Sequence, residues 1–232
     1  MVPQLVTVSL VEAIADDIRS NILRGEYPRD ASFTETEVAA RYDVARPTAK
    51  AAIEKLVAES LLERRSNKTA RVIKLGPEDV RDIYDTRARL EKAVLVQLAE
   101  SRKVPAGALA AQRDLERLGG ASGLDTVEPD MRFHMSLVDS IGSPRTSRMY
   151  DSLVSQVKLC MAQIQGLELV HPDRIIKEHQ HLLDLIEAGD GEAASSFLDE
   201  HLSRPRERLV EAVGGVAGPE ANLDSSLGDQ AV

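Results

Sequence analysis

Three histidines and one aspartate stand at spacings that suit a metal-ion site. Asp130 and His134 are four residues apart in the segment DMRFH, so in a helix both side chains lie on one face. His179 and His201 are each 10 residues from the nearer glycine of a Gly-Asp-Gly turn signal at 189–191. In an antiparallel helical hairpin with its turn there, these equal distances place both imidazoles at one height. A third helix could bring Asp130 and His134 to that pair.

Imidazole nitrogens and a carboxylate are donors that proteins offer to divalent transition ions. The sequence therefore predicts a site for zinc, nickel or manganese built from these four side chains. The competing interpretation is that the histidines are core residues held by ordinary hydrogen bonds. His181 is about 200° round the helix from His179 and is predicted to point away. His171 precedes a predicted helix start and is interpreted as a cap or surface group.

The elements that must position these residues are predicted to be helices. From residue 77 to about residue 213 the apolar spacing is helical throughout, with no alternating strand pattern. Breaks that divide this region into about six helices fall at 103–105, 119–123, 142–144, 166–172 and 189–191. We expect residues 77–213 to form an all-helical antiparallel bundle. Residues 214–232 are rich in Gly, Ala and Ser, and we expect a disordered tail.

A different pattern precedes this region. Thr34 and Glu37 form a capping box that starts a short helix, and a second helix begins near Arg46 after a break at 42–44. Two helices joined by a tight turn are typical of a helix-turn-helix, whose second helix presents its N-terminal residues to the DNA major groove. An amphipathic helix over 10–23 would support them from behind. An ordinary helical hairpin is the competing interpretation.

Two short segments, 61–65 and 70–74, are predicted strands, and a basic β-ribbon after a helix-turn-helix is a wing. Residues 43–74 hold eight basic and four acidic side chains, whereas the whole chain has a net charge of −9. A local basic patch on an acidic protein is typical of phosphate contact. Residues 1–75 are therefore predicted to be a winged helix-turn-helix domain, so the fold is mainly α. The residues expected to contact DNA are Thr36, Arg46, Pro47, Thr48, Lys50, Asn67 and Lys68.

Composition excludes several other classes. The single cysteine, Cys160, leaves no internal disulfide and no multi-thiolate zinc site. No run approaches the roughly 18 apolar residues of a membrane span and no signal peptide is visible, so we expect a cytoplasmic protein without a membrane partner. With no Trp and 3% aromatic residues, an aromatic platform for single strands is disfavoured. Double-stranded DNA is the expected partner, read as a palindromic operator by a homodimer.

The chain resembles the GntR-type bacterial transcription regulators of the FadR-like branch. VARPTAKAAI at 44–53 is similar to that family's recognition helix, V-S-R-x-x-V-R-x-A-L. YDTRARLE at 84–91 is similar to the "Y-x-x-R-x-x-L-E" that opens the family's helical FCD effector domain, and DMRFH is similar to its "D-x-x-F-H". Glu178-His179, the following Gly-Asp and His201-Leu202 are similar to its "E-H…G-D…H-L" ending. A departure is Ala45, where a helix-capping Ser or Thr is usual.

The resemblance implies that the one Asp and three His bind a metal, and that Arg87 clamps the carboxylate of a small organic acid effector. A planar guanidinium can pair a carboxylate with two hydrogen bonds. The competing role for Arg87 is a salt bridge to Glu91, one helical turn on. The leading hypothesis is a regulator whose DNA affinity changes when the effector binds. The alternatives are a metal-dependent hydrolase fused to a DNA-binding module and an effector-independent dimeric DNA-binding protein. The hydrolase alternative lacks a clear general base, because Glu178 adjoins His179 on the helix and is expected to point elsewhere.

Overall fold

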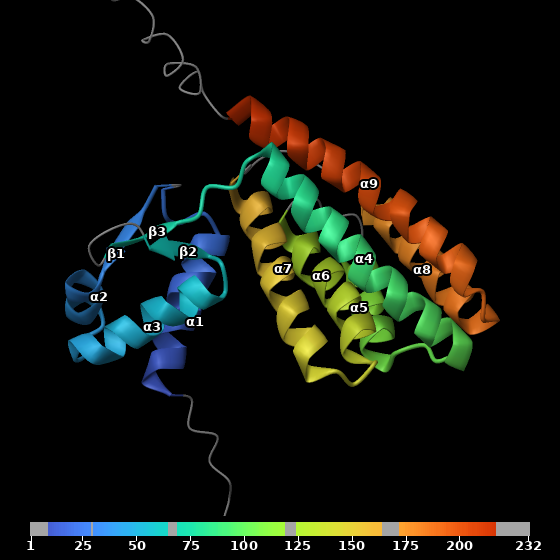
Figure 1. The fold of residues 1–232 in the computed structure, drawn as a ribbon, viewed down its shortest axis with the longest axis horizontal. Helices are drawn as coiled ribbons and strands as arrows, with labels where there is room; N and C mark the ends of the chain where they lie inside the picture. Colours follow the sequence, from blue (N-terminus) through green and yellow to red (C-terminus); the bar gives the residue numbers. More distant parts are fainter. Residues whose placement is uncertain (1–8, 29, 65–68, 119–123, 164–171, 217–232) are drawn as a thin grey trace, which may run out of the picture.

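The chain forms two units, a small one that contains the strands and a larger one built of helices (Figure 1). The computed structural model describes residues 9–28, 30–64, 69–118, 124–163 and 172–216. Within these ranges the first unit contains three helices and three strands, and six helices follow in the second unit. None of the described helices is both long enough and apolar enough to cross a membrane.

The small unit is a winged helix-turn-helix. Its elements are α1 (Leu10–Leu23), β1 (Ser32–Thr34), α2 (Glu35–Arg41), α3 (Arg46–Ala58), β2 (Leu62–Arg64) and β3 (Thr69–Val72). The predicted capping box starts α2, because the Thr34 hydroxyl accepts from the Glu37 amide and the Glu37 carboxylate accepts from the Thr34 amide. Asp43, in the turn, has a left-handed φ of 51°. Buried residues of α1 and α3, among them Ile18, Ile53 and Leu56, form the core of this unit.

The three strands pair antiparallel in the order β1-β3-β2. The sequence predicted the ribbon of β2 and β3. In the structure Leu62 pairs with Val72. The third strand, β1, was not predicted, because its three residues are too few for a periodic pattern and its last residue, Thr34, belongs to the capping box of α2. Phe33 pairs with Ala70 and both are buried, so β1 closes the sheet over the core. The predicted wing tip includes Asn67 and Lys68, which lie outside the described residues.

The large unit confirms the expected bundle of about six helices. They are α4 (Pro77–Ser101), α5 (Ala106–Arg117), α6 (Leu124–Asp139), α7 (Pro144–Gln163), α8 (Pro172–Ala188) and α9 (Gly191–Val216). The long helices α4 and α9 run side by side in opposite directions (Figure 1). The end of α9 lies three residues beyond the predicted limit at 213, because Gly214 is accommodated in the helix beside Pro77. The rest of the predicted tail lies outside the described residues.

The two units touch at one end of the bundle. The side-chain amide of Gln163, the last residue of α7, donates to the Ile73 carbonyl at 2.7 Å, just before the segment that enters α4. A cleft of about 220 Å³ lies beside this contact, between α1, β3 and the end of α7. Its walls include Ile22 and Val72 from the small unit and Leu159 and Ala162 from the large one. The end of α7 is therefore in direct contact with the small unit.

Candidate metal centre and DNA-binding surface

The structure brings together the four residues that were predicted to bind a metal. Asp130 and His134 come from α6, His179 from α8 and His201 from α9, and one donor atom of each lies within 4.8 Å of the others. His134 Nε2 is 3.2 Å from His201 Nε2, and His179 Nε2 is 3.2 Å from Asp130 Oδ1. Any two donors of a tetrahedral zinc ion, each about 2.0–2.2 Å from it, lie roughly 3.3–3.6 Å apart. The cluster therefore has the dimensions of a single-ion site.

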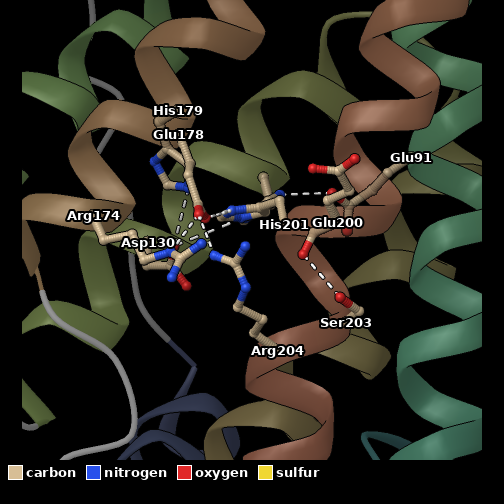
Figure 2. Close-up of polar contacts among 10 residues, drawn as sticks. Glu91, Asp130, Arg174, Glu178, His179, Glu200, His201, Ser203 and Arg204 are labelled. Carbon is tan, nitrogen blue, oxygen red and sulfur yellow. Dashed lines mark hydrogen bonds and ion pairs between the residues drawn. The ribbon is translucent and has the colours of Figure 1, made fainter.

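Two of the histidines are oriented by carboxylates. His134 Nδ1 lies 2.6 Å from Glu91 Oε2, and His201 Nδ1 lies 2.8 Å from Glu178 Oε2 (Figure 2). An ionised carboxylate only accepts hydrogen bonds, so Nδ1 of each ring is the donor to it and Nε2 is the nitrogen that faces the cluster. The two Nε2 atoms lie 3.2 Å apart, so both could coordinate one cation through their lone pairs. Carboxylates that hold the outer nitrogen of a histidine are typical of metal centres.

His179 lacks the hydrogen bonds expected of a core histidine. Its ring is stacked on Phe133 with a centroid distance of 3.7 Å, and among the described residues neither ring nitrogen has a hydrogen-bond partner. Its Nε2 is close to Asp130, but the ring is not aligned for a hydrogen bond. Buried polar groups are rarely left in this condition. The competing interpretation of the histidines as ordinary core residues therefore fits His179 poorly, whereas a metal ligand fits it well.

The charges of the cluster also suit a cation. Burial lowers the pKa of His179 to about 3, although Asp130 opposes this change, so the imidazole is neutral and available near pH 7. Burial alone would raise the pKa of Asp130, but the close contact with His179 and the electrostatic influence of the three nearby imidazoles hold it well below its usual range. An ionised carboxylate and neutral imidazoles form a donor set for a divalent transition ion.

Arg87 is buried in α4 beside this cluster. Its Nε donates to Glu91 Oε1 at 3.1 Å, so the salt bridge that was the competing interpretation is present. The Tyr150 hydroxyl donates to the same oxygen at 2.5 Å. Burial would raise the pKa of Glu91, but His134 and Arg87 lower it to about 2, and the carboxylate stays ionised. The Nη2 of Arg87 is nevertheless buried, and within the part of the chain that the structure describes it has no hydrogen-bond partner.

Three residues around the cluster were missed by the sequence analysis. Glu178 was expected to point elsewhere because it adjoins His179 on the helix, and this was wrong: it reaches His201 on the neighbouring α9. Glu91 was considered only as a partner of Arg87, although its second oxygen holds His134. No sequence pattern indicated that Tyr150 contacts the cluster, because its partner Glu91 is 59 residues away in the sequence. All three contacts depend on how separate helices pack.

The other two histidines, His171 and His181, were not predicted to be metal ligands. His181 is exposed and its ring lies 4.5 Å from that of Phe197, so it points away from the cluster as predicted. His171 lies outside the described residues.

Two of the helices that carry candidate ligands also contain a proline within four residues of one of these ligands. Pro129 precedes Asp130 in α6, and Pro205 lies four residues after His201 in α9, where it removes the amide that would bond the His201 carbonyl.

The predicted DNA-contacting residues lie at the start of α3 and in α2. Arg46, Pro47 and Lys50 are exposed, and Thr48 is half-buried, whereas the opposite side of α3 faces the core. The Arg46 guanidinium donates to the Thr36 hydroxyl, which ties the start of α3 to α2. Ala45 caps α3 without a side-chain hydrogen bond, as its sequence implied. Other basic residues of the patch are engaged within the unit: Lys55 pairs with Glu12, and Arg64 with Glu54.

Comparison with known families agrees with this architecture. The FCD domain matches residues 82–204, and the gntR family of bacterial regulatory proteins matches residues 10–72. The chain therefore belongs to the GntR family of bacterial transcriptional regulators and carries an FCD domain. Members of this family bind DNA through the winged unit and act on transcription.

Individual relatives cover nearly the whole chain. The chain is 27% identical to the HTH-type transcriptional repressor GlaR of Escherichia coli (strain K12) over 214 residues. This match covers 85% of the chain and 94% of GlaR. A GntR regulator from Rhodococcus sp. RHA1 has the same fold, with a TM-score of 0.73 at 20% identity over 87% of this chain and 98% of its own. The structure of Escherichia coli McbR/YncC also has this fold, with a TM-score of 0.69 and 19% sequence identity. The match covers 88% of this chain and 98% of McbR/YncC. The two family matches and the relative GlaR together identify the protein as a transcriptional regulator.

Proposed function

We propose that this regulator changes its affinity for operator DNA when a small organic acid binds beside a metal ion in the FCD domain. The observation that carries the proposal is the convergence of three imidazoles and Asp130 in the same domain as Arg87, whose buried Nη2 has no hydrogen-bond partner among the described residues. The four ligands would hold a zinc, nickel or manganese ion, which supplies a positive site for a carboxylate. Arg87 would donate to that carboxylate from α4. The sign of regulation in this proposal is repression, as the name of GlaR states for that relative.

A structural route from the site to the DNA-binding unit supports this proposal. Glu91 joins the ligand His134 to Tyr150 of α7, and the last residue of α7, Gln163, bonds the Ile73 carbonyl. A carboxylate that takes up the free donor of Arg87 would compete with Glu91 for the guanidinium. Tyr150 and α7 would then adjust, and α7 contacts the winged unit directly. An effector acts on DNA only by binding two arrangements with different affinity, typically by about 1–3 kcal/mol.

We also propose that the active species is a homodimer on a palindromic operator. One winged unit contacts few base pairs, and a two-fold dimer presents two recognition helices at the spacing of a two-fold site. Among the described residues Met149 of α7 and Val96 of α4 are large apolar side chains left exposed in the single chain. They are candidates for burial between two bundles, which would place α7 of each chain near the dimer axis.

Arg46→Ala is expected to reduce discrimination between operator and scrambled DNA by about 1–3 kcal/mol, because an arginine at the start of a recognition helix can pair a guanine with two hydrogen bonds. Fluorescence anisotropy with both duplexes at one salt concentration measures the ratio. Lys50→Ala serves as the matched control and is expected to weaken binding to both duplexes alike, through lost phosphate contact. An unchanged ratio in Arg46→Ala would show that Arg46 does not read bases.

Arg87→Gln tests the effector site. Operator binding is titrated with sugar acids, hydroxy acids and dicarboxylates, and the parent protein is expected to respond to at least one of them. In Arg87→Gln the half-maximal concentration should rise roughly tenfold or more, since a charge-assisted hydrogen bond is lost. Metal content and effector-free DNA binding should be unchanged. A response that is identical in the variant would remove Arg87 from the site, and an uncharged effector would overturn the carboxylate proposal.

A further inference from the structure

The outer side of the metal cluster carries two arginines. The ligand histidines are 0–7% exposed, whereas the side chain of Asp130 is 17% exposed and marks the side that solvent reaches. On this side Arg174 of α8 and Arg204 of α9 both bond Glu178 Oε1, at 2.5 and 3.2 Å. Figure 2 shows their guanidinium groups turned toward Glu178 from opposite sides. The other oxygen of Glu178 holds the ligand His201.

The two arginines are not neutralised by their shared partner. Glu178 is one carboxylate against two guanidinium groups, and neither arginine has another partner among the described residues. Their side chains are 45% and 51% exposed, so several N–H donors of each remain available to a solvent-side ligand. This excess positive charge is unusual in its setting, because residues 76–232 carry 17 basic and 27 acidic side chains.

The carboxylate also holds the pair in place. Because Glu178 is fixed to His201, the guanidinium groups are anchored at a constant position relative to the cluster. Arginine side chains lose less freedom on binding an anion when they are already ordered. An anchored, uncompensated pair at the open side of a cation site differs in this respect from arginines on an ordinary solvated helix face.

We propose that Arg174 and Arg204 form an outer anion subsite, so that the effector is an acid with two anionic groups. This inference rests on the proposed function. One carboxylate would bind at the inner position, between the ligands and Arg87. The second anionic group would bind the outer pair. A monocarboxylate would occupy only the inner position, so the outer pair determines which class of acid the regulator senses.

The test compares dicarboxylates with monocarboxylates of the same carbon number. Zinc-loaded full-length protein is titrated by calorimetry with malonate, succinate, glutarate and adipate, and with propionate through hexanoate. The parent is expected to bind its best dicarboxylate roughly tenfold or more tightly than its best monocarboxylate, because the outer group adds charge-assisted hydrogen bonds. In the double variant Arg174→Gln/Arg204→Gln that preference should disappear, while zinc content and monocarboxylate affinity stay within twofold of the parent.

The chain offers a matched control. Arg117 and Arg132 also share one carboxylate, that of Asp114, and both are exposed. The double variant Arg117→Gln/Arg132→Gln removes the same charge from the same domain, and it should keep the preference for dicarboxylates. A third variant, Arg174→Lys/Arg204→Lys, retains the charge without the planar fork and should keep part of the preference.

The outcomes separate this inference from the proposed function. Equal affinity of the parent for both series, or a preference that survives in Arg174→Gln/Arg204→Gln, overturns the outer subsite and leaves the metal–carboxylate function standing. A parallel loss of zinc and of monocarboxylate binding in that variant also overturns it, because the arginines would then serve only to position Glu178. If the parent binds no member of either series, the proposed function fails and the subsite fails with it.

Discussion

Glu91→Ala is expected to lower the free energy of unfolding by about 3–5 kcal/mol, the usual cost of removing one partner of a buried ion pair. Glu91 is fully buried, and its two oxygens accept from Arg87 Nε, the Tyr150 hydroxyl and His134 Nδ1. Without the carboxylate, the charge of Arg87 is buried with no counter-ion, and two further donors lose their acceptor. Urea unfolding of metal-free protein, followed by circular dichroism, measures the change.

A surface glutamate on the same helix provides the comparison. Glu78 pairs with Arg81 but its side chain is 88% exposed, so Glu78→Ala should alter stability by no more than about 0.5 kcal/mol. Glu91→Gln should fall between the two variants, since the amide keeps the volume and one acceptor oxygen but not the charge. A loss below about 1 kcal/mol in Glu91→Ala would mean that Arg87 is not held as a buried cation by this carboxylate.

His179→Ala is expected to lower zinc affinity by roughly a hundredfold or more, which exceeds the 10- to 100-fold cost of disturbing residues that only support metal ligands. The change removes one of four donors and leaves a cavity against Phe133. Parent and variant are loaded with zinc and dialysed against a weak chelator, and the bound metal is measured by mass spectrometry. The parent should retain about one ion per chain and the variant close to none.

The neighbouring His181→Ala is the control, because it lies two residues away on the same helix but its ring contacts Phe197 at the surface. Its zinc content and thermal midpoint should match the parent. Equal zinc in His179→Ala and the parent would count against the site as a whole. Loss of zinc from His181→Ala as well would show that the variants act through α8 stability and not through ligation.

The sequence analysis worked best where function depends on residues close together in the chain. The Thr34 capping box, the turn at Asp43 and the i,i+4 pair of Asp130 and His134 are local patterns, and each has the predicted conformation. His179 and His201 are equally far from the glycine turn in sequence, which predicted that they lie at the same height in a helical hairpin. The four residues that the structure brings together could be selected this way before any fold was known.

The parts that were missed depend on packing between helices. Glu178 and His179 are adjacent, and helical geometry turns their side chains about 100° apart. That rotation was read as pointing Glu178 away from the site, but α9 lies on that side and brings His201 to it. Strand β1 was missed for a different reason: three residues are too few for a periodic pattern, and its pairing with β3 is set by the sheet.

The prolines in α6 and α9 affect how far the ligands of the proposed metal site could move to fit ions of different radius. A ligand on an uninterrupted helix can move only if the helix moves as a body. Pro129 and Pro205 each remove one hydrogen bond from the backbone of their helix, and the loss of such a bond permits local bending. In the proposed metal site, Asp130 and His201 could then shift slightly, while His134 and His179 would keep their positions. A site of this kind would accept ions of different radius, and the ion that it holds would depend on the supply in the cell.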